Sequence, residues 1–102
     1  MHPLALLKRI KEPNPPVIVD ARTFFEFRNG HIHGAVHAPA WKILFCFAKI
    51  PSDKTAELVV TCEHGPSAIM VKSLLILYGY TNIALLEGQM IGWKKVGLPL
   101  EH

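Results

Sequence analysis

The sequence is poor in cysteine and has no long apolar run. It carries only two cysteines in 102 residues, whereas small disulfide-held domains usually carry four or more, so we expect reduced thiols rather than a disulfide framework. Lys42 and Lys49 flank the apolar segment 43–48, so no stretch approaches the ~20 residues that span a bilayer. The N-terminus also lacks an apolar run with a cleavage site for export. These absences predict a cytoplasmic protein that does not act at a membrane.

Charge of one sign is not concentrated anywhere in the chain. The 11 lysines and arginines exceed the 8 acidic residues by three, but they are scattered in ones and twos with no aromatic interleaving, which argues against nucleic acid as a partner. Half of the residues are hydrophobic, which is enough for one compact core, and a chain of 102 residues is too short for two independently folded domains. We predict a single domain over residues 1–99. Residues 100–102 resemble the start of an affinity tag and are set aside.

Alternating strand and helix patterns predict an α/β fold. Uninterrupted aliphatic runs indicate buried strands, and capping boxes, prolines and glycines mark where helices begin and end. The predicted strands are 17–19, 58–60 and 82–86, and the predicted helices are 4–10, 24–29, 41–50, 66–78 and 89–95, with 41–50 and 66–78 expected to be buried. Strands that alternate with helices imply a parallel sheet with helices on its faces.

Cys62 lies between the second predicted strand and a helix that begins at Pro66. Ligands bind at the carboxyl ends of strands in such sheets. The loop over residues 62–68 must turn sharply, so its backbone N–H groups are expected to face a small bowl that favours an anion. A helix N-terminus stabilises thiolate over thiol, and the thiolate is the nucleophile. The alternative is a buried structural cysteine.

Four motifs follow one another in an order typical of one family. They are Asp20-Ala21-Arg22, Glu26 followed by Gly30-His31-Ile32-His33-Gly34-Ala35, Cys62 after a hydrophobic strand, and Leu86-Glu87-Gly88 followed by Trp93 and Gly97-Leu98-Pro99. In order and spacing, residues 17–99 resemble the rhodanese family of sulfurtransferases. The resemblance implies a three-layer α/β domain with a central, mainly parallel sheet flanked by helices. It also implies a catalytic cysteine that cycles through a persulfide, matched by Cys62. The implied substrate-binding loop is Glu63, His64, Gly65, Pro66, Ser67 and Ala68.

The loop departs from this family pattern in its charge. Many single-domain members carry an arginine where this chain has Ser67 and Ala68, and Glu63 places an acid beside the cysteine. Glu63 would repel a dianionic donor if it points into the bowl, and would be screened if it points to solvent. Gln89 replaces the usual second glycine and is not expected to touch the chemistry directly.

The other polar residues are interpreted as structural. Arg22 and Glu26 are spaced to pair across a helical turn, and Cys46 is expected to be a packed thiol. Three nearby histidines have no acid or thiol spaced with them, so we expect no metal and no cofactor. These histidines are His31, His33 and His37.

Three functions remain open at this point. The leading one is transfer of a sulfane sulfur from a small-molecule donor, thiosulfate or a persulfide, to cyanide or a thiol acceptor through a Cys62 persulfide. A non-catalytic rhodanese-like binding module is the main alternative. A cysteine-based phosphatase or arsenate reductase is the third, but that class uses a loop one residue longer that ends in arginine, and residues 68 and 69 are Ala and Ile.

Overall fold

Helices and strands alternate along the chain in the computed structural model, which describes residues 1–63 and 65–102. In chain order the elements are α1 (Pro3–Ile10), β1 (Val17–Asp20), α2 (Phe24–Arg28), β2 (Val36–His37), α3 (Ala40–Leu44), β3 (Leu58–Thr61), α4 (Pro66–Leu77), β4 (Ile83–Leu85) and α5 (Gln89–Lys95). The predicted α/β class is therefore confirmed. No helix within the described ranges has both the length and the apolarity to cross a bilayer.

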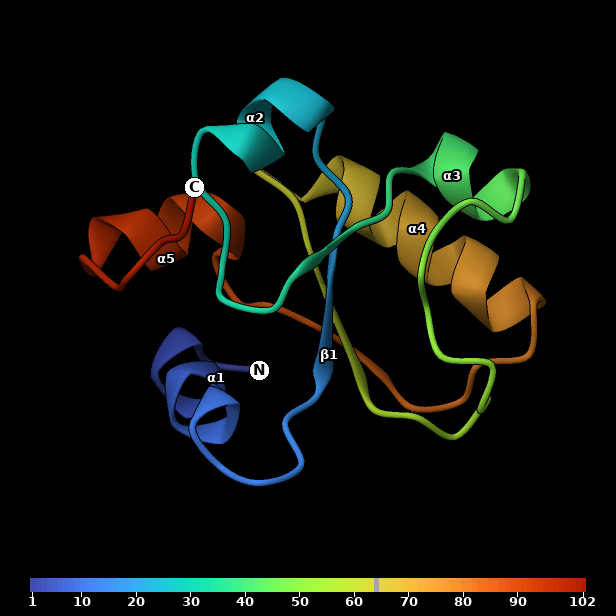
Figure 1. The fold of residues 1–102 in the computed structure, drawn as a ribbon, viewed down its shortest axis with the longest axis horizontal. Coiled ribbons are helices and arrows are strands. Elements are labelled where there is room, and N and C mark those ends of the chain that lie inside the picture. The colour runs from blue at the N-terminus through green and yellow to red at the C-terminus, as the bar shows by residue number, and fades with distance from the viewer. Residues whose placement is uncertain (64) are drawn as a thin grey trace.

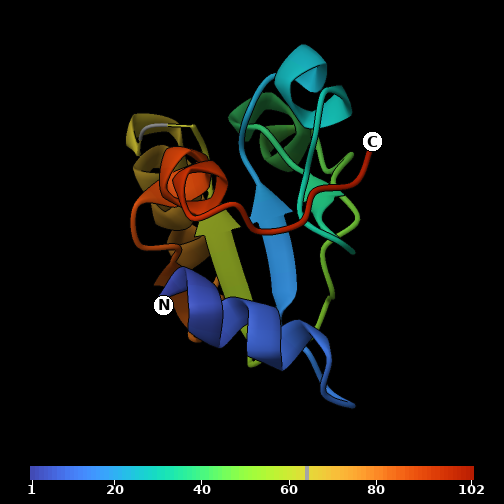
Figure 2. The same cartoon turned by 90° about the vertical axis from the view of Figure 1, so that its left-hand side faces the viewer.

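The sheet has four parallel strands in the order β2-β1-β3-β4. In its centre Val19 of β1 pairs with Val60 of β3, so these two strands are shielded by neighbours on both sides. The edge strand β2 has only two residues, and its short sequence gave no strand signal. All strand pairs are parallel, so the carboxyl ends of the strands form one edge of the sheet, toward which the arrows of the two central strands point in Figure 2.

Helices cover both faces of the sheet and complete three layers (Figure 1). Alternate residues of a strand face opposite sides: Ile18 packs with Trp93 on the face of α1 and α5, and Val19 packs with Val71 on the face of α3 and α4. Leu100 also packs against the cluster that contains Ile18 and Trp93. Glu101 forms two backbone hydrogen bonds with His31.

The predictions for two helices need correction. The helix expected over 41–50 ends at Leu44, because Cys46 adopts a left-handed backbone with φ of 59°, and Phe45 and Phe47 are exposed rather than buried. The α4 helix is not buried all round: Val71 faces the core, while Leu77 is 77% exposed. Both segments are apolar on all sides in the sequence, so the pattern could not indicate which face of each helix packs against the sheet.

Candidate functional site

Cys62 follows the last residue of β3 and lies at the carboxyl edge of the sheet. The thiol is almost fully buried, with Cys62 only 3% exposed. The backbone N–H of Gly65 donates a hydrogen bond to Cys62 Sγ at 2.8 Å. Gly65 has φ of 125°, a conformation that a side chain disfavours, so the sharp turn depends on glycine. The sequence predicted several backbone N–H groups around the thiol, and among the described residues the Gly65 N–H donates to Sγ.

The helix behind this turn adds to the stabilisation of an anion. Pro66 begins α4, which runs for 12 residues, and the unpaired N–H groups of its first turn carry partial positive charge. The loop residues Glu63, Pro66 and Ser67 line one hollow together with Cys62. Ala68 instead lies on the core-facing side of α4 and is fully buried. His64, the remaining predicted loop residue, lies outside the described residues.

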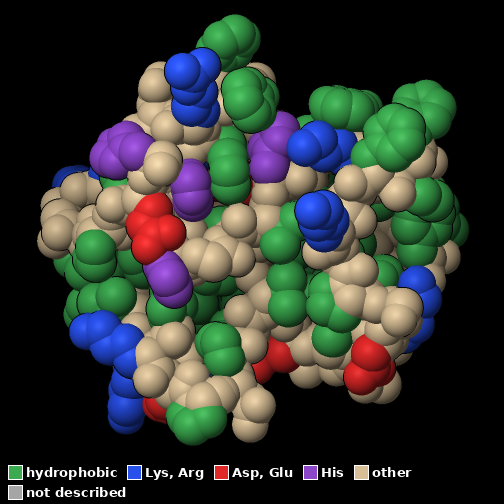
Figure 3. Space-filling model, in the orientation of Figure 1, with side chains coloured by type: hydrophobic (Ala, Val, Ile, Leu, Met, Phe, Trp, Pro, Cys, Tyr) green, Lys and Arg blue, Asp and Glu red, His purple; other side chains and the backbone are tan. Residues whose placement is uncertain are grey.

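Aromatic side chains also line this hollow, which has a volume of about 630 Å³. Phe24 and Phe25 come from α2 and Trp41 comes from α3. All three are more than half exposed, and Figure 3 shows hydrophobic side chains standing out on the molecule over these two helices. Trp41 falls in the segment 41–50 that was predicted to be a buried helix, but it is half exposed and lines the hollow. The two phenylalanines were missed because nothing in the sequence relates α2 to Cys62.

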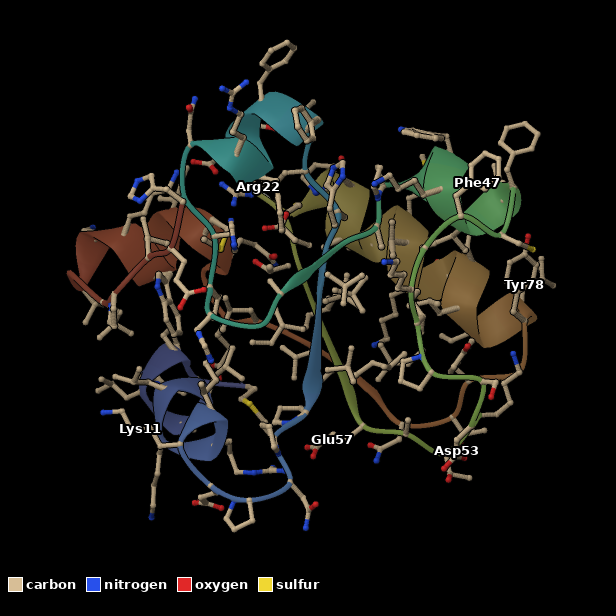
Figure 4. The ribbon with its side chains drawn as sticks, in the orientation of Figure 1. Lys11, Arg22, Phe47, Asp53, Glu57 and Tyr78 are labelled. Atoms are coloured by element: carbon tan, nitrogen blue, oxygen red, sulfur yellow. The ribbon has the colours of Figure 1, made fainter. Side chains whose placement is uncertain are left out.

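Charges beside the thiol are paired in a chain of four side chains. Arg22 is buried and donates to both carboxylate oxygens of Asp20, at 2.9 Å and 3.0 Å. Its Nη1 donates to Glu63 at 3.2 Å, and Lys94 donates to the same carboxylate at 3.1 Å. Figure 4 shows Arg22 at the end of the molecule opposite Glu57. The predicted pair of Arg22 with Glu26 is wrong.

The prediction failed because both residues have other partners. Glu26 closes a capping box with Thr23 at the start of α2, while the guanidinium of Arg22 turns inward and also donates to Gly30 O at 2.6 Å. The hydrogen bonds of Arg22 join Asp20, Gly30 and Glu63, and its structural role stays a prediction.

Glu63 lines the hollow without acting as a free negative charge. Burial raises its pKa, but the hydrogen bonds and charges of Lys94 and Arg22 more than offset burial, so the pKa of Glu63 lies below its ordinary value. The pKa of Arg22 is raised because its bonds to Asp20 and Glu63 outweigh the effect of burial. The four charges sum to zero, with two acids and two bases, so Glu63 remains ionised within a neutral group.

Gln89 contacts the backbone of Cys62. Its side-chain oxygen Oε1 accepts a hydrogen bond from the backbone N–H of Cys62 at 2.9 Å. The two residues are 27 positions apart, and only the replacement of a usual glycine marked Gln89 as unusual in the sequence. Gln89 contacts the backbone of the cysteine and not its sulfur, so the expectation that it does not touch the chemistry directly stays a prediction.

The remaining candidates lie elsewhere. His31 contacts Phe27 O, His33 contacts Glu101 and His37 contacts Arg22 O, each through a ring nitrogen. No group of three or more metal-binding side chains occurs among the described residues. Cys46 is exposed rather than packed and lines a different hollow, of about 480 Å³, with Tyr78 and Tyr80. Cys46 is therefore absent from the lining of the Cys62 hollow.

Known proteins resemble this chain over nearly its whole length. The family model described as Rhodanese-like domain matches residues 3–96. A sulfurtransferase of Allochromatium vinosum is 29% identical over 96 residues, which cover 94% of this chain and 88% of the relative. The thiosulfate sulfurtransferase GlpE of Haemophilus influenzae is 31% identical over 85 residues, 83% of this chain and 79% of the relative.

The fold agrees with these sequence matches. The crystal structure of the Alr3790 protein from Anabaena sp. superposes with a TM-score of 0.86 at 26% identity, covering 99% of this chain and 81% of that one. The cysteine loop at the carboxyl edge of a parallel sheet therefore belongs to a fold and sequence pattern shared with known proteins. The chain is a member of the rhodanese-like domain family.

Proposed function

We propose that this protein is a sulfurtransferase whose Cys62 carries the transferred sulfur as a persulfide. The observation that carries the proposal is the buried Cys62 thiol, which accepts the Gly65 N–H at 2.8 Å beside the N-terminus of α4. Donors of this kind stabilise the thiolate before reaction and negative charge on sulfur after it. Relatives named sulfurtransferase and thiosulfate sulfurtransferase support the same reaction class.

The reaction has two displacements at sulfur. The Cys62 thiolate attacks the sulfane sulfur of thiosulfate, the bond between the two sulfur atoms breaks, and sulfite leaves with the electron pair. With an organic persulfide, the thiolate of the carrier leaves instead. An acceptor thiolate or cyanide then attacks the outer sulfur of the Cys62 persulfide, which forms the acceptor persulfide or thiocyanate and regenerates the Cys62 thiolate.

The lining of the hollow favours an organic persulfide as donor and an organic thiol as acceptor. Its aromatic wall of Phe24, Phe25 and Trp41 offers apolar contact, whereas the charges on the other side sum to zero and provide no net attraction for a dianion. Thiosulfate is expected to react, but with a lower specificity constant than an organic persulfide. Reduced thiols suit a cytoplasmic location, which stays a prediction.

A phosphatase or arsenate reductase is disfavoured by the arginine in this hollow. Such enzymes need a free guanidinium to clamp the oxyanion. Among the described residues that line the hollow, Arg22 has the only guanidinium, and it already donates to Asp20, Gly30 and Glu63.

The test is the intact mass of the protein after incubation with thiosulfate or an organic persulfide. We expect the wild type and Cys46→Ser to gain one sulfur atom that cyanide removes, and Cys62→Ser to gain none. Cys46→Ser is the matched control, because Cys46 is the exposed thiol and reacts first with a non-selective reagent. Sulfur on Cys46 with Cys62 unmodified would contradict the proposal, and no uptake from either donor would favour the binding module.

A further inference from the structure

Gln89 has a backbone conformation that is uncommon for a residue with a side chain. Its φ is 55°, directly after Gly88 with φ of 74°. Within the described ranges only one other non-glycine residue, Cys46 on an exposed turn, has positive φ. A side chain in this region clashes with the neighbouring carbonyl, so glycine would fit position 89 with less strain. Strain of this kind often accompanies a functional constraint.

The first turn of α5 holds the backbone of Cys62 on both sides. Gln89 Oε1 accepts the Cys62 N–H at 2.9 Å, and the Met90 N–H donates to the Cys62 carbonyl at 2.9 Å. The Ile91 N–H donates to the carbonyl of Glu63 at 3.4 Å. The N–H groups of a first helical turn have no partner within the helix, so these donors are available to the loop. The Cys62 N–H is itself a donor, and the acceptor that the structure shows for it among the described residues is the side-chain oxygen of Gln89.

We propose that Gln89 is a positioning residue for the Cys62 thiol, an inference that rests on the proposed sulfur transfer. By accepting the Cys62 N–H, its amide oxygen fixes the peptide group that precedes the nucleophile. Sγ is thereby held against the Gly65 N–H and directed toward the incoming sulfur. Without that acceptor, a partly buried N–H lacks a partner and the loop rearranges to satisfy it. Small displacements of a nucleophile cost much of the rate.

This role predicts a particular kinetic signature. Gln89 is not among the residues that line the hollow, so its loss should leave KM for the donor nearly unchanged and lower kcat. A purely structural role predicts a different pattern, in which activity follows stability.

Three variants separate these possibilities. Gln89→Met keeps the length and the strain but has no acceptor oxygen, Gln89→Gly removes both the strain and the acceptor, and Gln89→Glu keeps an acceptor. We expect Met and Gly to lower kcat about tenfold, with the Gly variant as stable as the wild type in thermal unfolding. We expect Glu to lose less rate than Met.

Hydrogen exchange of the Cys62 amide, followed by NMR, reports on the contact without any sulfur transfer. We expect slow exchange in the wild type and Gln89→Glu, and fast exchange in Gln89→Met and Gln89→Gly. Wild-type kcat in both Gln89→Met and Gln89→Gly would overturn the proposal, and so would wild-type kcat in Gln89→Gly alone. A wild-type protein that takes up no sulfur would instead refute the proposed function. In that case, faster exchange of the Cys62 amide in Gln89→Met than in the wild type would still establish the contact between Gln89 and the Cys62 N–H.

Discussion

Glu63→Gln is expected to make thiosulfate a better donor. The substitution leaves Asp20, Arg22 and Lys94 in the group beside Cys62, so its net charge changes from zero to plus one. At a distance of about 7 Å and an effective dielectric constant of about 40 to 80, one unit charge stabilises a dianion by about 1 to 2 kcal/mol. The specificity constant for thiosulfate should therefore rise by about 5- to 30-fold.

The assay is steady-state transfer to cyanide at two salt concentrations. We expect the gain to shrink as salt is added, because a higher ionic strength shortens the screening length. An alkyl persulfide carries at most one negative charge, so its gain in free energy should be about half that of the thiosulfate dianion or less. Glu57→Gln is the matched control: it removes the same charge from a carboxylate that pairs with Arg9 at 2.6 Å, at the far end of the molecule from Arg22 (Figure 4). An equal gain with both donors, or with Glu57→Gln, would refute the electrostatic explanation.

Three further predictions concern stability. Arg22→Met should lower the free energy of unfolding in urea by about 3–5 kcal/mol, because it leaves a buried carboxylate unpaired. Arg9→Met, which breaks a partly exposed ion pair with Glu57, should cost much less because solvent screens that pair, and equal losses would contradict the assigned burial. The pKa of Glu63 is lower in the folded protein than its ordinary value of 4.5, so ionised Glu63 stabilises the fold above pH 4.5 and this stabilisation is lost as the pH falls through the folded pKa. The difference in the free energy of unfolding between wild type and Glu63→Gln should therefore shrink in acid. A difference independent of pH would argue against the ion pairs of Glu63. Leu75→Ala in the core face of α4 should cost about 2–5 kcal/mol and Leu77→Ala on its exposed face less than about 0.5 kcal/mol, measured by thermal unfolding, and similar costs would restore the prediction of a helix buried all round.

The local signals in the sequence were reliable where one short segment determines the structure. The aliphatic runs before Asp20 and Cys62 form the two central strands, the Thr23 and Glu26 pair caps α2, and Pro66 begins α4. Backbone conformation and capping depend on neighbouring residues, so the sequence carries this information directly. The same holds for Cys62, whose place after a strand and before a helix was sufficient to predict its N–H donor.

Relations between distant segments were not available from the sequence. The sequence alone determined an α/β chain, a cysteine loop and a family pattern. The tertiary structure decided that Glu63 pairs with Arg22 and Lys94, that Phe24 and Trp41 line the same hollow as Cys62, and that Gln89 accepts the Cys62 N–H. Each of these contacts joins residues that become neighbours only when the strands pair and the helices pack, because a side chain's partners are set by three-dimensional proximity rather than by its position in the chain.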